Sequence, residues 1–216
     1  ITGLQQIGRR TWTAGEGRFV LNYQATVDVA REPVNLARLK AVPMRSLPGR
    51  VVHFLWPSRY VQSDALKEFA VNQFGEPSGR AVVAMAQWTQ ANIQYLPGCS
   101  DEATTACDTF NQKQGICRDF AHVMVSFARA LDIPARMVSA YAWNLDPPDF
   151  HAVVEIYLAD GEQGGAWYLI DPSGLAPVEG IVRIGVGRDA TDISFMTIFG
   201  GEAKLSNQTV AVERLG

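Results

Sequence analysis

The stretch from Ile116 to Leu131 is the feature that most constrains the fold of this 216-residue chain. Apolar side chains occupy nearly every side of the segment, whereas a surface helix carries only one apolar stripe. Its helical spacing predicts a helix, and Pro134 follows just after the expected end. A helix that is apolar all round needs cover on every side, so the rest of the chain has to pack around it.

Three strand-like runs follow that helix along the chain, at residues 136–143, 151–158 and 167–171. A glycine-rich loop at 159–165 joins the last two runs as a hairpin. One helix followed by at least three strands is typical of an α+β fold, in which a central buried helix packs on an antiparallel sheet. We therefore predict this fold class.

The part of the chain before that helix divides into two predicted regions. Alternating apolar residues predict strands within residues 4–30, with a turn near 14–17, and residues 51–56 predict another strand. We therefore expect an N-terminal β-rich region at 1–62 and a main domain at 63–216. Helices are predicted in the first part of this domain, at residues 63–74, 80–93 and 101–112.

Composition narrows the classes of partner. Apolar residues make up 47% of the chain and charged residues 19%, which is typical of a compact folded protein. The formal charge is -3 and no basic run is interleaved with aromatics, so a nucleic-acid partner is not expected. No apolar stretch approaches the roughly 20 residues that a membrane-spanning helix needs.

The number of cysteines and the first residues of the chain give information on the cellular location of the protein. Cys99, Cys107 and Cys117 are too few for a disulfide scaffold, which favours a reducing, cytoplasmic location. A bridge between Cys99 and Cys107 stays open, but two separate thiols are the favoured interpretation. The chain opens at Ile1 without a leader-like segment, so we expect either a removed leader or a start inside a longer product.

Cys117 lies at the expected start of the buried helix, two residues after Gly115. The first-turn amides and the dipole of a helix stabilise negative charge there, including that of a thiolate, the nucleophilic form of cysteine. A neighbouring imidazolium would stabilise the thiolate further. Cysteine alone is more often a small packing residue, so the assignment depends on finding a histidine and an acid.

His151 and Asp171 are the candidate partners. His151 opens one strand of the predicted hairpin, and Asp171 closes the other. If Val153 lies opposite Asp171, the acid is diagonal to His151, about 7–8 Å away at the backbone and within reach of its ring. The acid would then fix the tautomer and orientation of the imidazole. Pairing of Asp171 with an even-numbered residue would put it on the wrong face.

Other polar residues are interpreted as structural. His122 is only five residues from Cys117, but at 100° per residue it points about 140° away on the same helix. His53 lies inside a predicted strand without a partner. The remaining residues in this class are predicted caps, turn formers or ion-pair partners: Asp119, Asp149, Asp189, Asp192 and Arg188.

Metal and cofactor sites are not expected. The chain has no Cys-x2–4-Cys pair and no His-x3–5-His pair, the spacings that zinc sites use. It has no Walker loop, and the glycines at 185–187 do not form a dinucleotide-binding motif. We therefore predict neither a metal nor a cofactor.

Several motifs together resemble the bacterial transglutaminase-like superfamily, whose members are similar to papain-type cysteine peptidases. The strand-rich start resembles the region that often precedes this domain in bacterial members. Val153 stands where family members often have Trp, and Ser173 stands where many have Thr. The motifs that carry the resemblance are residues 115–122 and 130–136, His151-Ala152, Asp171-Pro172 and residues 187–189.

The resemblance implies a transglutaminase-like, papain-like core with Cys117 as nucleophile, His151 as general base and acid, and Asp171 as the orienting acid. It also implies thiol-dependent attack on a peptide or protein amide. The Cys117 amide is a natural first oxyanion donor, and Gln114 or Tyr95 is a possible second donor.

The fate of the acyl group is not determined by these motifs. Hydrolysis, as in a peptidase or amidase, is the favoured outcome, because no feature excludes water or defines an amine channel. Two alternatives stay open: a protein-glutamine transglutaminase with an amine acceptor, and a catalytically silent peptide-binding module.

Overall fold

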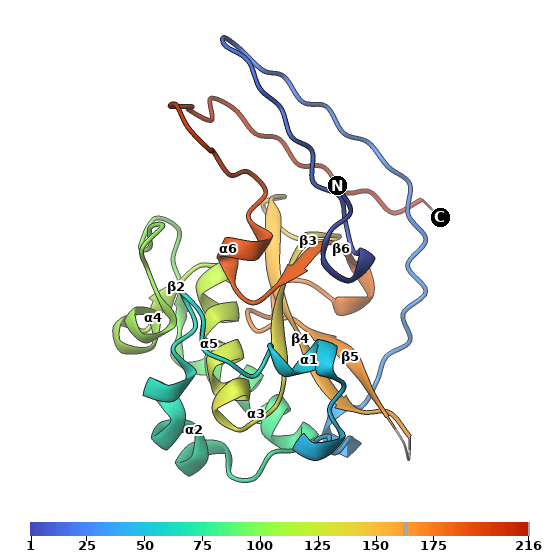
Figure 1. The fold of residues 1–216 in the computed structure, drawn as a ribbon, viewed down its shortest axis with the longest axis vertical. Helices are drawn as coiled ribbons and strands as arrows, with labels where there is room; N and C mark the ends of the chain where they lie inside the picture. Colours follow the sequence, from blue (N-terminus) through green and yellow to red (C-terminus); the bar gives the residue numbers. More distant parts are fainter. Residues whose placement is uncertain (162–163, 216) are drawn as a thin grey trace.

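The predicted buried helix is α5 (Cys117–Ala130) in the computed structural model, which describes residues 1–161 and 164–215. Every residue from Asp119 to Ala130 is buried. A four-stranded sheet covers one side of α5, and three helices pack on its other sides (Figure 1). These helices are α2 (Lys67–Phe74), α3 (Gly79–Asn92) and α4 (Ala106–Gln112).

The sheet is antiparallel and runs in the order β5-β4-β3-β6. Alternate residues of β4, such as Val154 and Ile156, belong to the same core cluster as α5. A central helix on an antiparallel sheet confirms the predicted α+β class. The strands are β3 (Ala135–Ala142), β4 (Phe150–Ala159), β5 (Gly165–Ile170) and β6 (Ile181–Gly187). The sequence prediction missed β6, because Gly185 and Gly187 weaken its strand pattern.

The register of the β4–β5 hairpin is the one predicted. Val154 pairs with Ile170 and Glu155 with Leu169, so the next step of the ladder sets Val153 opposite Asp171. Asp171 therefore lies diagonal to His151. Residues 162–163 of the predicted hairpin loop lie outside the described residues.

The three helices predicted before α5 are also confirmed. The first comprises a 3-10 turn, η4 (Ser63–Leu66), and α2, and it ends at Gly75 with a positive φ of 70°. The second is α3, whose Ser78 cap accepts a hydrogen bond from the Ala81 N–H at 3.2 Å. The third is α4. The remaining short elements are η1 (Leu4–Gln6), η2 (Leu36–Arg38), η3 (Met44–Ser46), α1 (Gly49–Val52), β1 (Gln94–Tyr95), β2 (Gln114–Gly115), η5 (Val178–Gly180) and α6 (Ala190–Ile193).

The strands predicted within residues 4–30 are wrong. Among the described residues no strand forms in this segment, whose regular structure is limited to a 3-10 turn and one isolated bridge residue, Arg9. Alternating side chains such as Phe19, Leu21 and Tyr23 are exposed. An alternating pattern forms a sheet only when a neighbouring strand supplies hydrogen bonds and another layer covers the apolar face. The described part of the chain provides neither for these residues.

The strand predicted at residues 51–56 is also wrong, and His53 therefore does not lie in a strand. The segment begins with the helical turn α1, and His53 follows at its end. Val51 and Phe54 are fully buried and stand three residues apart, which places them on one side of a helical turn. The β-rich character predicted for residues 1–62 is thus not found, whereas the division after residue 62 stays a prediction.

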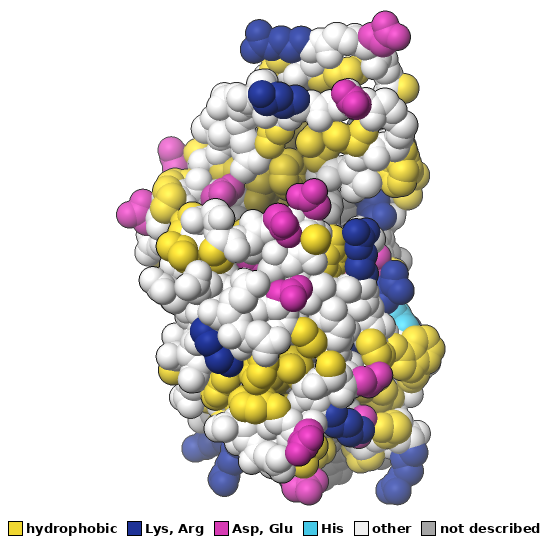
Figure 2. All heavy atoms as spheres, turned by 90° about the vertical axis from the view of Figure 1, so that its left-hand side faces the viewer, with side chains coloured by type: hydrophobic (Ala, Val, Ile, Leu, Met, Phe, Trp, Pro, Cys, Tyr) yellow, Lys and Arg dark blue, Asp and Glu magenta, His cyan; other side chains and the backbone are white. Residues whose placement is uncertain are grey.

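Two extended segments, residues 10–34 and 194–215, project above the sheet, and the first then returns along its side (Figure 1). They meet where the Trp12 and Phe199 rings approach to 5.4 Å between centroids. Figure 2 shows hydrophobic side chains exposed in this upper part of the molecule. None of the described helices is long and apolar enough to cross a membrane.

Candidate active site

Cys117 is the first residue of α5, directly after the short parallel pair of β1 and β2. Gly115 is the last residue of β2. A side chain does not fit at this position, because an added Cβ would lie 2.7 Å from the Asp119 Cβ. Asp119 accepts a hydrogen bond from the Ile116 N–H at 2.9 Å. The Cys117 N–H donates to no backbone carbonyl among the described residues and instead interacts with the Tyr95 hydroxyl. An amide at a helix start can also bind an anion.

His151 and Asp171 are in direct contact, with 2.9 Å between Nε2 and Oδ2. The acid is held in place from several directions. Its Oδ1 accepts from the Ser173 N–H and hydroxyl at 2.9 and 2.6 Å, and its Oδ2 accepts from the Ala176 N–H at 3.0 Å. Thr89 on α3 holds the neighbouring Pro172 carbonyl at 3.0 Å. The buried core thus orients the carboxylate, and the carboxylate orients the imidazole.

The second ring nitrogen of His151, Nδ1, is buried and makes no hydrogen bond among the described residues. Burial by itself would lower the pKa of His151. Interactions with the Asp171 carboxylate and the Cys117 thiol outweigh burial and raise this pKa to about 9. The influence of the thiol on this pKa indicates that Cys117 lies near the imidazole, although Nδ1 has no hydrogen-bond partner among the described residues. A protonated imidazole at neutral pH favours the negative charge of a neighbouring thiolate.

The Asp171 carboxylate responds in the opposite sense. Burial would raise the pKa of Asp171, but hydrogen bonds from His151, Ser173 and Ala176 outweigh it and lower the pKa. At neutral pH the acid is therefore ionised and the histidine is protonated. The structure brings together all three residues predicted for the site.

Tyr95 lies beside Cys117, because β1 sets it opposite Gly115. Burial and the negative charge of Cys117 raise the pKa of Tyr95 to about 12, and its hydroxyl interacts with both the thiol and the amide of Cys117. The hydroxyl is therefore protonated at neutral pH and can donate a hydrogen bond. Gln114, the other predicted oxyanion donor, pairs with Gln94 in the same small sheet.

His122 does not take part in this site. It is fully buried, its Nε2 accepts from the Ala190 N–H at 3.2 Å, and its ring stacks on Tyr60 at 5.1 Å. Burial, reinforced by the positive charge of Arg118, lowers the pKa of His122 to about 3. The structural interpretation of His122 therefore agrees with its contacts.

The carboxylates interpreted as structural also have local partners. Asp149 accepts from the Phe150 N–H at 2.7 Å, Asp189 caps α6, and Asp192 pairs with Arg188 at 3.0 Å. The thiols of Cys99, Cys107 and Cys117 are all free. In the described part of the chain, no three His, Cys, Asp or Glu side chains are grouped as they would be to hold a metal ion.

Comparison with known proteins agrees with this geometry. The family model of the transglutaminase-like superfamily matches residues 67–172, the segment that runs from α2 to just beyond Asp171. This part of the chain is therefore similar to a transglutaminase-like core. This core comprises α2 to β5 and includes Cys117, His151 and Asp171.

The core is also similar to individual proteins. An uncharacterised protein of Mycobacterium leprae is 33% identical over 122 residues, which are 53% of this chain and 42% of that protein. An uncharacterised protein of Mycobacterium tuberculosis is 24% identical over 143 residues, 61% of this chain and 46% of that protein. The chain thus spans less than half the length of these curated relatives.

A solved structure matches a larger share of the chain than these two relatives do. It is that of a proposed cysteine protease from Cytophaga hutchinsonii, with 43% identity and a TM-score of 0.71. The match covers 76% of this chain and 55% of that one.

Proposed function

We propose that this chain is a cysteine-dependent enzyme that cleaves amide bonds in peptides or proteins through a thioester, with water as the final acceptor. The observation that carries the proposal is the buried pair of His151 and Asp171, 2.9 Å apart, together with the Cys117 thiol at the start of α5, whose proximity helps to raise the pKa of His151. The similar structure from Cytophaga hutchinsonii, named as a proposed cysteine protease, supports hydrolysis as the outcome.

The first half of the reaction makes the thioester. The Cys117 thiolate attacks the amide carbonyl carbon, and the carbonyl oxygen becomes an oxyanion next to the Cys117 N–H. The protonated His151 then gives its proton to the nitrogen as the C–N bond breaks, and the amine leaves. Asp171 stabilises the imidazolium and keeps its Nδ1 toward the thiol.

The second half releases the acid. The neutral His151 takes a proton from a water molecule, which attacks the thioester carbon. The C–S bond breaks, the thiolate of Cys117 is restored, and His151 holds the proton again. The protein needs no oxidant, reductant or cofactor for these steps.

Tyr95 completes the proposed oxyanion site. Its hydroxyl lies beside the Cys117 amide and stays protonated at neutral pH, so it can donate to the same oxygen. Replacing Tyr95 by Phe removes this donor and keeps the ring. We expect kcat for a cleaved peptide to fall about tenfold or more, with KM nearly unchanged.

The proposed function is tested in two steps. Iodoacetamide should label Cys117 at pH 6 much faster than Cys99 and Cys107, as measured by mass spectrometry of the digested protein. Equal, slow labelling of the three thiols would contradict an activated nucleophile.

Peptide mixtures are then incubated with and without an added primary amine, with Cys117→Ala as the control. Cleaved peptides that depend on Cys117 support hydrolysis. Amine adducts at glutamine, formed without cleavage, would show that the enzyme transfers the acyl group to an amine and does not hydrolyse the amide.

A further inference from the structure

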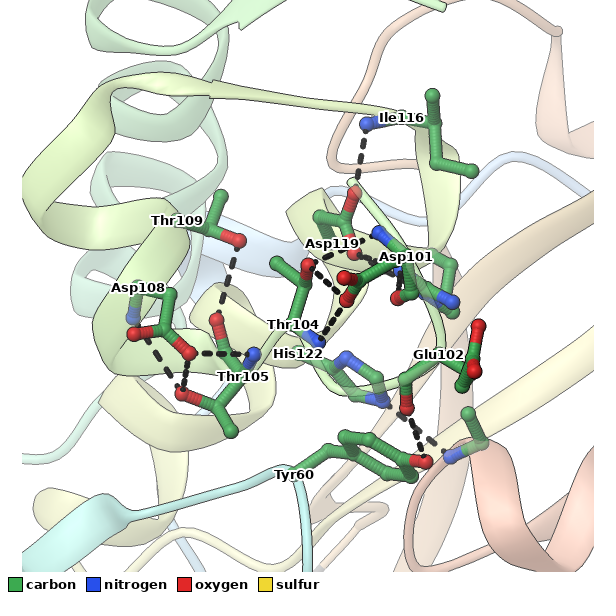
Figure 3. A network of polar contacts seen from close by, with 12 residues as sticks. Tyr60, Asp101, Glu102, Thr104, Thr105, Asp108, Thr109, Ile116, Asp119 and His122 are labelled. Carbon is green, nitrogen blue, oxygen red and sulfur yellow. Dashed lines mark hydrogen bonds and ion pairs between the residues drawn. The ribbon is translucent and has the colours of Figure 1, made fainter. Parts of the chain in front are cut away.

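Helices α4 and α5 both begin with an aspartate three residues after the cap, but the two aspartates have different tasks. At α4, Thr105 and Asp108 cap each other: Asp108 accepts from the Thr105 N–H at 2.9 Å, and its own N–H donates to the Thr105 hydroxyl at 3.3 Å (Figure 3). This is a complete capping box. At α5 the cap residue is Ile116, whose side chain has no acceptor, so Asp119 acts alone.

Both carboxylate oxygens of Asp119 are occupied. Oδ2 accepts from the Ile116 N–H at 2.9 Å, and Oδ1 accepts from Arg118 at 3.0 Å from Nε and 2.9 Å from Nη2. The Asp119 side chain is fully buried, whereas that of Arg118 is partly exposed. A buried charge of this kind is stable only while its partners stay in place. Glycine at position 115 leaves the space that the Asp119 side chain occupies, because a Cβ there would lie 2.7 Å from the Asp119 Cβ.

Arg118 extends this arrangement to the preceding loop. Its Nη2 donates to the Asp101 carbonyl at 2.7 Å, and the Tyr60 hydroxyl donates to the Glu102 carbonyl at 2.6 Å (Figure 3). The loop before α4 is thereby tied to the first turn of α5. Asp119 thus binds both neighbours of Cys117: Ile116, the residue before it, and Arg118, the residue after it.

We propose that Asp119 is a positioning residue for Cys117. By holding both neighbours of the cysteine, it keeps the thiolate at the N-terminus of α5 and beside His151. Arg118 offsets the charge of Asp119, so the acid does not oppose negative charge on the thiol. This inference rests on the proposed thiol chemistry and adds to it a role for the acid two residues after Cys117.

The test compares Asp119→Asn and Asp119→Ala with Asp108→Ala in the full chain. Asp108→Ala is the matched control, because it removes the same type of cap from a helix without the nucleophile. The rate of iodoacetamide labelling at Cys117 is measured by mass spectrometry from pH 5 to 9, and thermal unfolding is followed in parallel.

Asp119→Ala should lower the labelling rate at pH 6 at least tenfold and move the rate profile to higher pH. Asp119→Asn should lower it about threefold, since the amide oxygen can still accept from Ile116. Asp108→Ala should leave the rate within twofold of the wild type while it lowers the Tm.

Each outcome separates the two proposals. If wild-type Cys117 labels no faster than Cys99 and Cys107, the proposed function itself fails. If wild-type Cys117 labels fast and the folded Asp119 variants keep that rate, only the positioning role is wrong. Equal rate losses in the Asp119 and Asp108 variants would reduce Asp119 to a general stabilising cap. If Asp119→Ala does not fold, Asp119→Asn decides by the same criteria.

Discussion

His151 and His122 share a residue type, nearly complete burial and an Nδ1 without a hydrogen bond among the described residues. Their pKa values nevertheless move in opposite directions, to about 9 for His151 and to about 3 for His122. The groups around each ring make the difference: the Asp171 carboxylate and the Cys117 thiol raise the pKa of His151, whereas burial and the charge of Arg118 lower that of His122. His151 meets the Asp171 carboxylate, whereas His122 accepts a hydrogen bond from the Ala190 N–H.

This comparison teaches that burial does not by itself determine the charge of a histidine. Burial penalises the charged form of both rings. A nearby carboxylate stabilises the imidazolium and can reverse this penalty. A backbone N–H instead donates to the lone pair of the neutral ring, so it further disfavours the charged form. One buried histidine is therefore suited to carry a proton, and the other holds the start of α6.

The largest expected effect follows from removing the charged ring. His151→Gln should lower the rate of iodoacetamide labelling of Cys117 at pH 6 about 100-fold, because the thiolate loses its imidazolium partner. The rates of Cys99 and Cys107 in the same sample serve as the internal control. An unchanged Cys117 rate would show that His151 does not activate the thiol.

Removing the carboxylate should have a smaller effect. In Asp171→Asn the pKa of His151 falls, because the attraction that outweighed burial is lost. We expect the labelling rate at pH 7 to fall about tenfold, with the imidazole titrating at lower pH in NMR spectra. Ser173→Ala is the control, since it removes only one neutral hydrogen bond from Asp171. Equal effects of the two substitutions would contradict the role given to the charge.

The two histidines should also act oppositely on folding stability. For His122, the unfolded pKa near 6.5 exceeds the folded value of about 3, so the unfolded chain binds more protons below pH 6.5. Its contribution to the free energy of unfolding should fall by about 3 kcal/mol between pH 6.5 and pH 4. For His151 the folded pKa is the higher one, so its contribution is complete below pH 6.5 and is lost as the pH rises through about 9.

Urea unfolding at a series of pH values measures how the free energy of unfolding changes with pH in both ranges. His122→Asn should flatten the loss between pH 6.5 and 4, and His151→Gln should flatten the loss between pH 6.5 and 9. If His122→Asn loses as much free energy of unfolding between pH 6.5 and 4 as the wild type, groups other than His122 cause that loss.

The smallest expected effect is that of His122→Asn on the reactivity of the Cys117 thiol. His122→Asn should leave the labelling rate of Cys117 within twofold of the wild type, because His122 has no contact with the thiol among the described residues. A loss approaching that of His151→Gln would end the division of roles between the two histidines.

Much of the core was predictable because its signals are local. The apolar run of α5, the hairpin register and the angle between Cys117 and His122 all follow from helix and strand periods. The strands expected near Phe19 and Val51 failed for a non-local reason. Their patterns are compatible with a sheet, but a sheet needs a partner strand, and Val51 instead enters the core on a helical turn.

The sequence by itself determined the central helix, the strand that carries His151 near its start, and the distance along the chain between Cys117, His151 and Asp171. The tertiary structure alone decided what surrounds these groups: Tyr95 beside the thiol, the hydrogen bonds that hold Asp171, and the closed environment of His122. The physical reason is that element periods act over a few neighbouring residues. Burial and the partner of a charged group, by contrast, depend on segments brought together only by folding.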